Sequence, residues 1–216
     1  VVLNLAGSAI FLISVGMIYS VTGTLNMADL AVKVPQVTGE NLNIVRAGGM
    51  MLLVVFGLKA AILPLCFWLP GAYSKATAPV AALFAVMTKV GIYAIIRVYL
   101  LIFGDDAGAL ANLGMDWLFP IALVTLAMGV IGALGASSLR KLVACQVIIS
   151  VGTLLAPVAL GSEAGLSAAL FYLLSTTWTV GGLFLVAELI ANRRGAAGDR
   201  IITAPKMRNR RFLGIL

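Results

Sequence analysis

Long apolar segments separated by short polar ones dominate the pattern of this chain. They cover roughly residues 1–20, 46–69, 78–103, 115–136, 140–160 and 165–191. A helix needs about 20 apolar residues to cross a hydrocarbon core of about 30 Å, and each segment is close to that length or longer. The pattern therefore predicts an all-α fold, a polytopic transmembrane bundle of about six spanning helices.

Composition supports a membrane location for the whole chain. Of its 216 residues, 62% are hydrophobic and only 11% are charged, with a mean hydropathy of +1.09. A soluble domain has about 25% charged residues. A chain with so few charges could not cover a water-exposed surface with polar groups, which excludes an ordinary soluble domain.

The distribution of basic residues predicts an orientation. The net charge is +7, and seven of the fifteen basic residues lie between Arg193 and Arg211. Together with Lys75, Arg140 and Lys141 these make ten bases on one side, against two in the segment 21–46 on the other. The positive-inside rule then makes the basic loop 192–211 cytoplasmic. Bases in a membrane flank indicate attraction to anionic lipid rather than nucleic-acid binding.

Several kinds of site are excluded by residue type. The chain has no histidine, so His-based metal sites, haem ligation and Ser-His-Asp catalysis cannot occur within it. Cys66 and Cys145 lie in apolar surroundings and imply no disulfide framework. We expect no cofactor and no metal. The chain begins without Met and ends in an apolar run, and we interpret both ends as cuts in a longer protein.

Two lysines inside predicted spans are the main candidate site residues. Lys59 lies eleven residues before Pro70, and Lys89 lies eleven residues after Ala78. At 1.5 Å per residue both lie about 16 Å deep, near the bilayer midplane. Desolvation and mutual repulsion both favour loss of a proton there, which suits a proton relay. The alternatives are snorkelling, for which the side chains are too short, or pairing with a carboxylate outside this chain.

Polar residues near these lysines are weaker candidates. Pro64 predicts a helix break, which indicates either a hydrated site beside Lys59 or a simple packing kink. Tyr93 and Arg97 follow Lys89 at i+4 and i+8 and predict a polar stripe, either an exit path or an anchor at the interface. Thr88 precedes Lys89.

Two more helices carry polar residues whose role stays open. Ser175 and Thr179 lie in the last predicted span, where hydroxyls can simply bond their own helix. Gln146 and Ser150, at i+4 in the span 140–160, could bridge water or pack helices.

Three motifs then identify a resemblance. They are the run 57–70, GLKAAILPLCFWLP, the run 78–84, APVAALF, and the run 88–94, TKVGIYA. They resemble the antiporter-like membrane subunits shared by respiratory complex I, membrane hydrogenases and Mrp-type monovalent cation/proton antiporters. The run 21–30, VTGTLNMADL, and the stretch 176–188 with its basic tail are most similar to the D-type subunit of Mrp antiporters. The resemblance covers essentially the whole chain.

The resemblance implies an inverted-repeat fold with a proline-broken helix, of which this chain is about helices six to eleven. Residues 1–103 would be the last three helices of the first repeat and 104–114 an extracytoplasmic loop. Residues 115–191 would be the first three helices of the second repeat, followed by the basic cytoplasmic loop 192–211 and the start of another helix at 212–216.

It also implies roles for the lysines. In the family the lysine matching Lys59 pairs with a glutamate on an earlier helix, which is outside this chain, and the lysine matching Lys89 continues a central polar axis. The sequence departs from many relatives, which have His at Cys66, Asp at Gly71, His near Ser175 and Lys near Val180. These departures argue against a complex I proton subunit.

We therefore expect a component of a multisubunit Na⁺ or K⁺/proton antiporter in a bacterial plasma or inner membrane, not an enzyme. Its partners would be other antiporter subunits, the lipid bilayer, protons and monovalent cations, with no nucleic acid. The alternative is a proton-translocating subunit of NADH–quinone oxidoreductase or of a membrane hydrogenase. A membrane scaffold without transport is a third interpretation.

Overall fold

The computed structural model describes residues 2–202, and these form helices joined by short connections. The long helices are α1 (Val2–Thr22), α3 (Glu40–Ala60), α5 (Ala78–Leu101), α6 (Met115–Leu134), α7 (Leu139–Ala159) and α8 (Glu163–Arg194). All six are long and apolar enough to cross a membrane, which confirms the predicted polytopic bundle. The start of a further helix at 212–216 and residues 203–211 of the predicted loop 192–211 lie outside the described residues.

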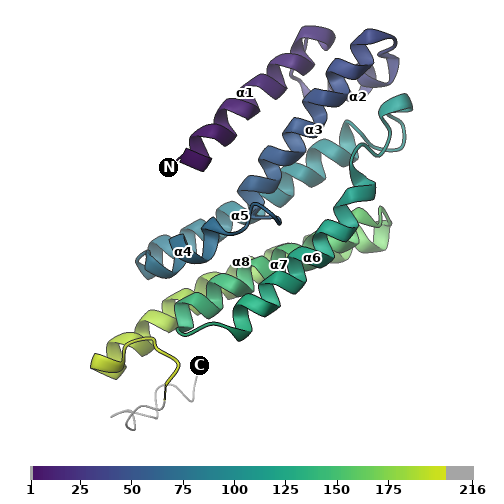
Figure 1. The fold of residues 1–216 in the computed structure, drawn as a ribbon. Helices are drawn as coiled ribbons and strands as arrows, with labels where there is room; N and C mark the ends of the chain where they lie inside the picture. Colours follow the sequence, from purple (N-terminus) through teal and green to yellow (C-terminus); the bar gives the residue numbers. More distant parts are fainter. Residues whose placement is uncertain (1, 203–216) are drawn as a thin grey trace.

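The helices run roughly along one direction in two groups (Figure 1). Helices α1, α3 and α5 pack as one group, and α6, α7 and α8 pack as the other. Helix α5 joins the groups because it packs against both α7 and α8. The first group lies within the predicted range 1–103, and the second extends from 115 to 194.

Short helices differ from the sequence prediction. The polar segment after α1 contains α2 (Met27–Lys33) and the 3₁₀ turn η1 (Val34–Gln36), and α3 begins at Glu40 rather than near residue 46. Asn26 accepts a hydrogen bond from the Ala28 N–H at 3.0 Å and so caps the start of α2. A hydrogen bond from Lys33 lowers the pKa of Asp29 below its ordinary value, and their ion pair measures 3.0 Å.

The break that Pro64 predicts within the span 46–69 is present, but the bounds of that span are wrong. Helix α3 ends at Ala60, and a separate helix, α4 (Trp68–Lys75), follows after a non-helical segment. Pro70 does not close the span, because it lies inside α4. A proline is tolerated in the first turn because the N–H groups there have no partner within the helix.

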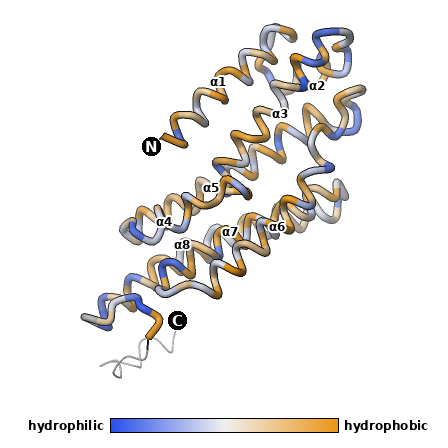
Figure 2. The backbone as a smooth tube through the Cα atoms, in the orientation of Figure 1, coloured by the Kyte–Doolittle hydropathy of each residue, from blue (hydrophilic) through white to orange (hydrophobic). Residues whose placement is uncertain are grey.

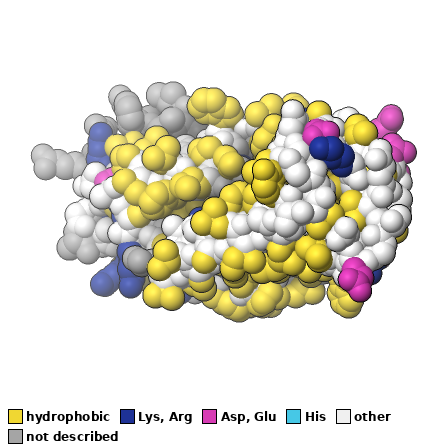
Figure 3. Space-filling model, turned by 90° about the horizontal axis from the view of Figure 1, so that it is seen from above, with side chains coloured by type: hydrophobic (Ala, Val, Ile, Leu, Met, Phe, Trp, Pro, Cys, Tyr) yellow, Lys and Arg dark blue, Asp and Glu magenta, His cyan; other side chains and the backbone are white. Residues whose placement is uncertain are grey.

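Hydrophilic residues are concentrated at the two ends of the bundle (Figure 2), and on the face seen in Figure 3 the charged side chains lie toward the ends with a mainly hydrophobic middle. One end, which we call the basic end, carries Lys75, Arg140, Lys141, Arg193 and Arg194. An apolar middle with charged ends is the surface that a bilayer requires.

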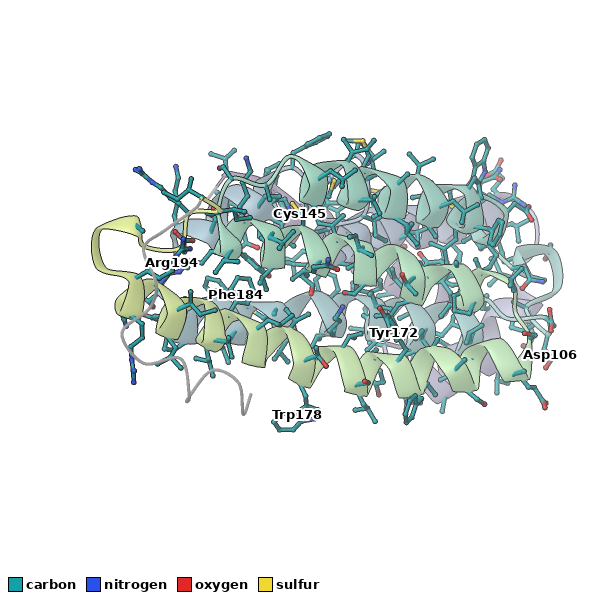
Figure 4. All side chains as sticks on the ribbon, turned by 90° about the horizontal axis from the view of Figure 1, so that it is seen from below. Asp106, Cys145, Tyr172, Trp178, Phe184 and Arg194 are labelled. Carbon is teal, nitrogen blue, oxygen red and sulfur yellow. The ribbon has the colours of Figure 1, made fainter. Side chains whose placement is uncertain are left out.

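The interior contains two apolar clusters. The larger cluster includes Ile92, Tyr99 and Val151, and the smaller one, nearer the basic end, includes Tyr73, Val147 and Phe184. Phe184 points toward the neighbouring helices, whereas Trp178 on the same helix points away from them (Figure 4). Most of the surface of α8 is therefore free to contact lipid or further protein.

Charged side chains connect the helix ends at the basic end. Glu188 of α8 accepts from the Ala78 N–H at 3.1 Å, and Arg140 of α7 donates to the Ala76 carbonyl at 3.1 Å. The Arg140 guanidinium also lies 3.8 Å from the Glu188 carboxylate. We call these four residues the basic-end clasp. It satisfies backbone groups that the ends of α4 and α5 would otherwise leave unpaired.

Candidate functional site

A set of buried polar side chains lies between the two apolar clusters. It consists of Thr88 and Lys89 on α5, Thr125 on α6, Ser150 on α7 and Thr176 on α8, and we call it the polar layer. On α5 the layer separates Ala85 of the smaller cluster from Ile92 of the larger one, and on α7 it separates Ile148 from Val151.

The members of the layer share one depth in the bundle. The contact between Ala78 and Glu188 puts these two residues at the same level near the basic end. Lys89 is eleven residues from Ala78, and Thr176 is twelve residues from Glu188. At 1.5 Å per residue the two lie about 16 and 18 Å from that level. The layer therefore crosses the middle of the bundle, at the depth predicted for Lys89.

Lys89 is the charged member of the layer and only 2% of it is exposed. Its ammonium donates a hydrogen bond to the Ser150 Oγ, whose own proton is donated to the Val147 carbonyl at 2.7 Å. The acidic residues of the described chain lie in loops or within about two turns of a helix end. They are Asp29, Glu40, Asp105, Asp106, Asp116, Glu163, Glu188 and Asp199. In residues 2–202, then, the polar partner of Lys89 is a neutral hydroxyl.

Lys59 lies in the last turn of α3, is half-buried, and points to another helix. Its ammonium donates a hydrogen bond to the Asn4 Oδ1 of α1. Sequence reasoning missed Asn4, although an amide within an apolar run is a signal that could have been noticed. Lys59 thus has a neutral acceptor, as Lys89 does. The acceptor of Lys59 is on α1, which packs against α3, whereas the acceptor of Lys89 is on α7, which packs against α5.

The backbones of the two lysine regions are in direct contact. A Cβ built on Gly91 would lie 2.7 Å from the Ala60 N and 3.1 Å from the Lys59 carbonyl carbon, so only a glycine allows this approach. Lys59 therefore lies at the level of the layer, in agreement with the common depth predicted for both lysines. For Lys59 the count of eleven residues from Pro70 crosses the helix break, so helix rise does not give its depth. The contact at Gly91 reaches the same depth by packing.

The helix break beside Lys59 begins before Pro64. Ala61 adopts a left-handed conformation with φ 59°, and the Ile62 N–H donates to the Gly57 carbonyl at 2.9 Å, which ends α3. The Leu63 N–H then donates to the Thr125 Oγ1 of α6 at 3.1 Å. A member of the polar layer thus satisfies a backbone group that the break leaves free, as backbone at membrane depth requires.

The remaining candidate residues face outward. Tyr93 is 49% exposed and Arg97 is exposed, so the predicted stripe does not continue the buried position of Lys89. Gln146 is exposed, as are Ser175 and Thr179. On α8 it is Thr176, not these two, that faces the interior.

An apolar cavity of about 280 Å³ lies between α3, the helix break and α6. Gly57, Pro64 and Trp117 are among its lining residues, and no charged side chain lines it. It has the character of a hydrocarbon site rather than an ion site. No group of three or more metal-ligand side chains (His, Cys, Asp or Glu) comes together within the described part of the chain.

This chain is similar to known proteins. The family described as "NADH:quinone oxidoreductase/Mrp antiporter, TM" matches residues 1–210. A Rhizobium meliloti (strain 1021) protein, named as the D component of a probable K(+)/H(+) antiporter, is 49% identical over 92% of this chain and 37% of its own length. The D component of the Na(+)/H(+) antiporter of Bacillus subtilis (strain 168) is 43% identical over 91% of this chain and 39% of its own length.

A solved structure, "Structure of Mrp complex from Dietzia sp. DQ12-45-1b", contains a similar chain. The TM-score is 0.77 with 35% sequence identity, over 88% of this chain and 34% of that one. The present chain spans less than two fifths of the length of each of these three relatives.

Proposed function

The chain belongs to the NADH:quinone oxidoreductase/Mrp antiporter transmembrane family, and we propose that it is part of the D-type subunit of a multisubunit monovalent cation/proton antiporter. In this proposal protons move along a buried polar axis through Lys59 and Lys89. The observation that carries it is the ammonium of Lys89, which lies in an apolar interior with one neutral acceptor.

Exchange of a proton at Lys89 follows from this environment. A charge at the centre of a bilayer costs about 2.5–3.5 kcal/mol on insertion scales, so a buried ammonium needs a function or a counter-charge. A single hydroxyl stabilises the charged form less than a carboxylate would. The amine can therefore lose its proton without leaving an unpaired carboxylate behind, which a relay requires.

The neighbouring residues have supporting roles in this proposal. The break that begins at Ala61 and includes Pro64 interrupts the helix beside Lys59. Thr88 lies in the polar layer next to Lys89. In this proposal Tyr93 and Arg97, which are exposed on α5, extend the path beyond Lys89. A shared coupling between protons and cations requires that the binding of one disfavours the other.

The wider assembly is also part of the proposal. Relatives include a chain of a multisubunit Mrp complex, which supports other membrane subunits as partners. We place the protein in a bacterial cell membrane with the basic end in the cytoplasm, because bases concentrate on that side. Its role is secondary transport rather than catalysis.

The experiment uses inverted vesicles that contain the full-length protein with its partner subunits. A lactate-driven proton gradient is followed with a pH-sensitive dye, and Na⁺ or K⁺ is then added. Wild type should dissipate the gradient on cation addition, and Lys59→Ala should not. Lys141→Ala, an exposed lysine at the basic end, is the matched control and should behave like wild type. Equal dissipation by Lys59→Ala would remove Lys59 from the path.

A second candidate is a proton-translocating subunit of a redox-driven complex, because the family description covers NADH:quinone oxidoreductase as well. In that case NADH or another electron donor would energise vesicles through this complex, and added cations would have no effect. The same vesicles therefore distinguish the two functions.

A further inference from the structure

Ser150 stands at the junction between the two groups of helices. Lys89 belongs to α5 of the first group and Ser150 to α7 of the second, and their hydrogen bond joins the groups within the polar layer. Both residues are almost fully buried, at 2% and 3% exposure. The contact is therefore an interior one, shielded from solvent by the surrounding helices.

The hydroxyl of Ser150 has a fixed direction. Its proton is donated to the Val147 carbonyl at 2.7 Å, so its free lone pair is the part that meets the Lys89 ammonium. Thr153, one turn further along α7, also bonds a carbonyl of its own helix, that of Ile149 at 2.9 Å, but it accepts nothing from a lysine. Ser150 thus both donates to its own helix and accepts a hydrogen bond from a lysine on another helix.

We propose that Ser150 is a positioning residue for proton transfer at Lys89. Its hydroxyl holds the ammonium against α7, so that the proton carried by Lys89 is presented to the second helix group. This inference rests on the proposed function and adds to it the residue that receives Lys89 across the boundary. Ser150 itself neither gains nor loses a proton in the step.

The physical reason is the freedom of a lysine side chain. Four rotatable bonds allow its ammonium to sample many positions, and a fixed acceptor selects one of them. Misplacing a reacting group by about 1 Å can lower a rate by about 100-fold. Without Ser150 the ammonium also lacks its acceptor in the described chain, and an unpaired buried donor is costly.

The test uses the complete antiporter complex in inverted vesicles with Ser150→Ala, Ser150→Cys and Ser150→Thr. Alanine removes the acceptor, cysteine keeps nearly the same volume with a much weaker acceptor, and threonine keeps the hydroxyl. We expect the maximum exchange rate to fall about tenfold for Ala and Cys and to return to within about twofold for Thr. The cation concentration for half-maximal exchange should not change.

Two matched variants decide the interpretation. Thr153→Val removes a hydroxyl that bonds only its own helix and should leave exchange unchanged. Lys89→Met should lower exchange about 100-fold if the proposed function holds. If Lys89→Met retains exchange, the inference fails together with the proposed function.

The inference alone would be overturned by three results: normal exchange with Ser150→Ala and Ser150→Cys, normal exchange with Cys alone, or an equal loss with Thr153→Val. Normal exchange with Cys alone would mean that the volume of the side chain matters and the acceptor does not. If Ser150→Ala does not accumulate in the membrane, the Cys and Thr pair decides the question.

Discussion

The polar layer and the basic-end clasp hold charged side chains in opposite ways. In the layer, Lys89 is buried and its partner in the described chain is one neutral hydroxyl. In the clasp, Arg140 and Glu188 share an ion pair and each also bonds a backbone group at a helix end. The clasp is partly exposed, with 21% of the Arg140 side chain and 34% of the Glu188 side chain accessible.

The difference separates charges that hold the bundle together from charges that can change. A side chain with several complementary partners is committed to one protonation state, because changing it breaks every bond at once. A charge with one neutral partner loses less on proton release. We therefore expect the loss of the Lys89 charge to affect transport more than stability, and mutations in the clasp to do the reverse.

The largest expected effect is that of Lys89→Met. Methionine keeps the length of the side chain and removes the charge, so exchange should fall about 100-fold, within the range of lost proton-transfer groups. The midpoint of thermal denaturation in detergent should stay the same or rise, because a buried charge has been removed. A large drop in the midpoint would mean that Lys89 stabilises the bundle as the clasp residues do, which would contradict the expected difference between them.

Gly91→Ala should have the next largest effect. The added methyl group would lie 2.7 Å from the Ala60 N, which forces α3 and α5 apart at the level of both lysines. We expect a destabilisation of about 1–3 kcal/mol, seen as a lower denaturation midpoint, and a several-fold loss of exchange. Gly182→Ala on α8 is the control, because nothing lies within 4 Å of its added Cβ and alanine favours a helix. Equal behaviour of the two variants would contradict the close contact.

Arg140→Ala tests the clasp itself. It removes the ion-pair partner of Glu188 and the donor to the Ala76 carbonyl. We expect a destabilisation of about 1–2 kcal/mol, seen as a denaturation midpoint lower by a few degrees. Exchange per assembled complex should change by less than about twofold. Lys141→Ala, its exposed neighbour, should change neither quantity. A specific loss of exchange with unchanged stability would move Arg140 into the transport path.

Thr125→Val should give the smallest effect. Valine has nearly the same shape but removes the acceptor of the Leu63 N–H at the helix break, a loss of about 1 kcal/mol. The denaturation midpoint should fall slightly and exchange by no more than about twofold. Thr177→Val, whose hydroxyl bonds the Leu173 carbonyl of its own helix, is the control and should be neutral. If Thr125→Val abolished exchange, the break would belong to the path and not only to the fold.

Part of this architecture could be predicted from local sequence. The apolar segments identify five of the six spans within about three residues, because each must match the thickness of the same hydrocarbon core, while the span predicted at 46–69 is observed at Glu40–Ala60. The two intramembrane lysines can also be identified from the sequence, because a basic residue within an apolar spanning segment is rare. The depth of Lys89 follows from helix rise alone, whereas that of Lys59 is set by the contact between Gly91 and the end of α3.

The details of the candidate site could not be predicted in this way. The predicted span 46–69 contains a break whose start depends on Ala61 and on the contact with Thr125, two features without a strong local signal. Ser175 and Thr179 are the candidates that the sequence suggests, whereas the interior position belongs to Thr176, one residue after Ser175. In a helix that is apolar on every side, periodicity does not identify the buried face.

The sequence alone identifies six membrane-spanning helices within residues 2–202 and the lysines that bring charge to the middle of the bundle. Only the tertiary structure decided which partners those charges meet: Asn4 for Lys59 and Ser150 for Lys89. Span and depth depend on residue type and on a constant rise along one helix. Partners depend on the rotation of each helix and its distance from its neighbours, which are set by contacts between residues far apart in the chain, such as Gly91 and Ala60.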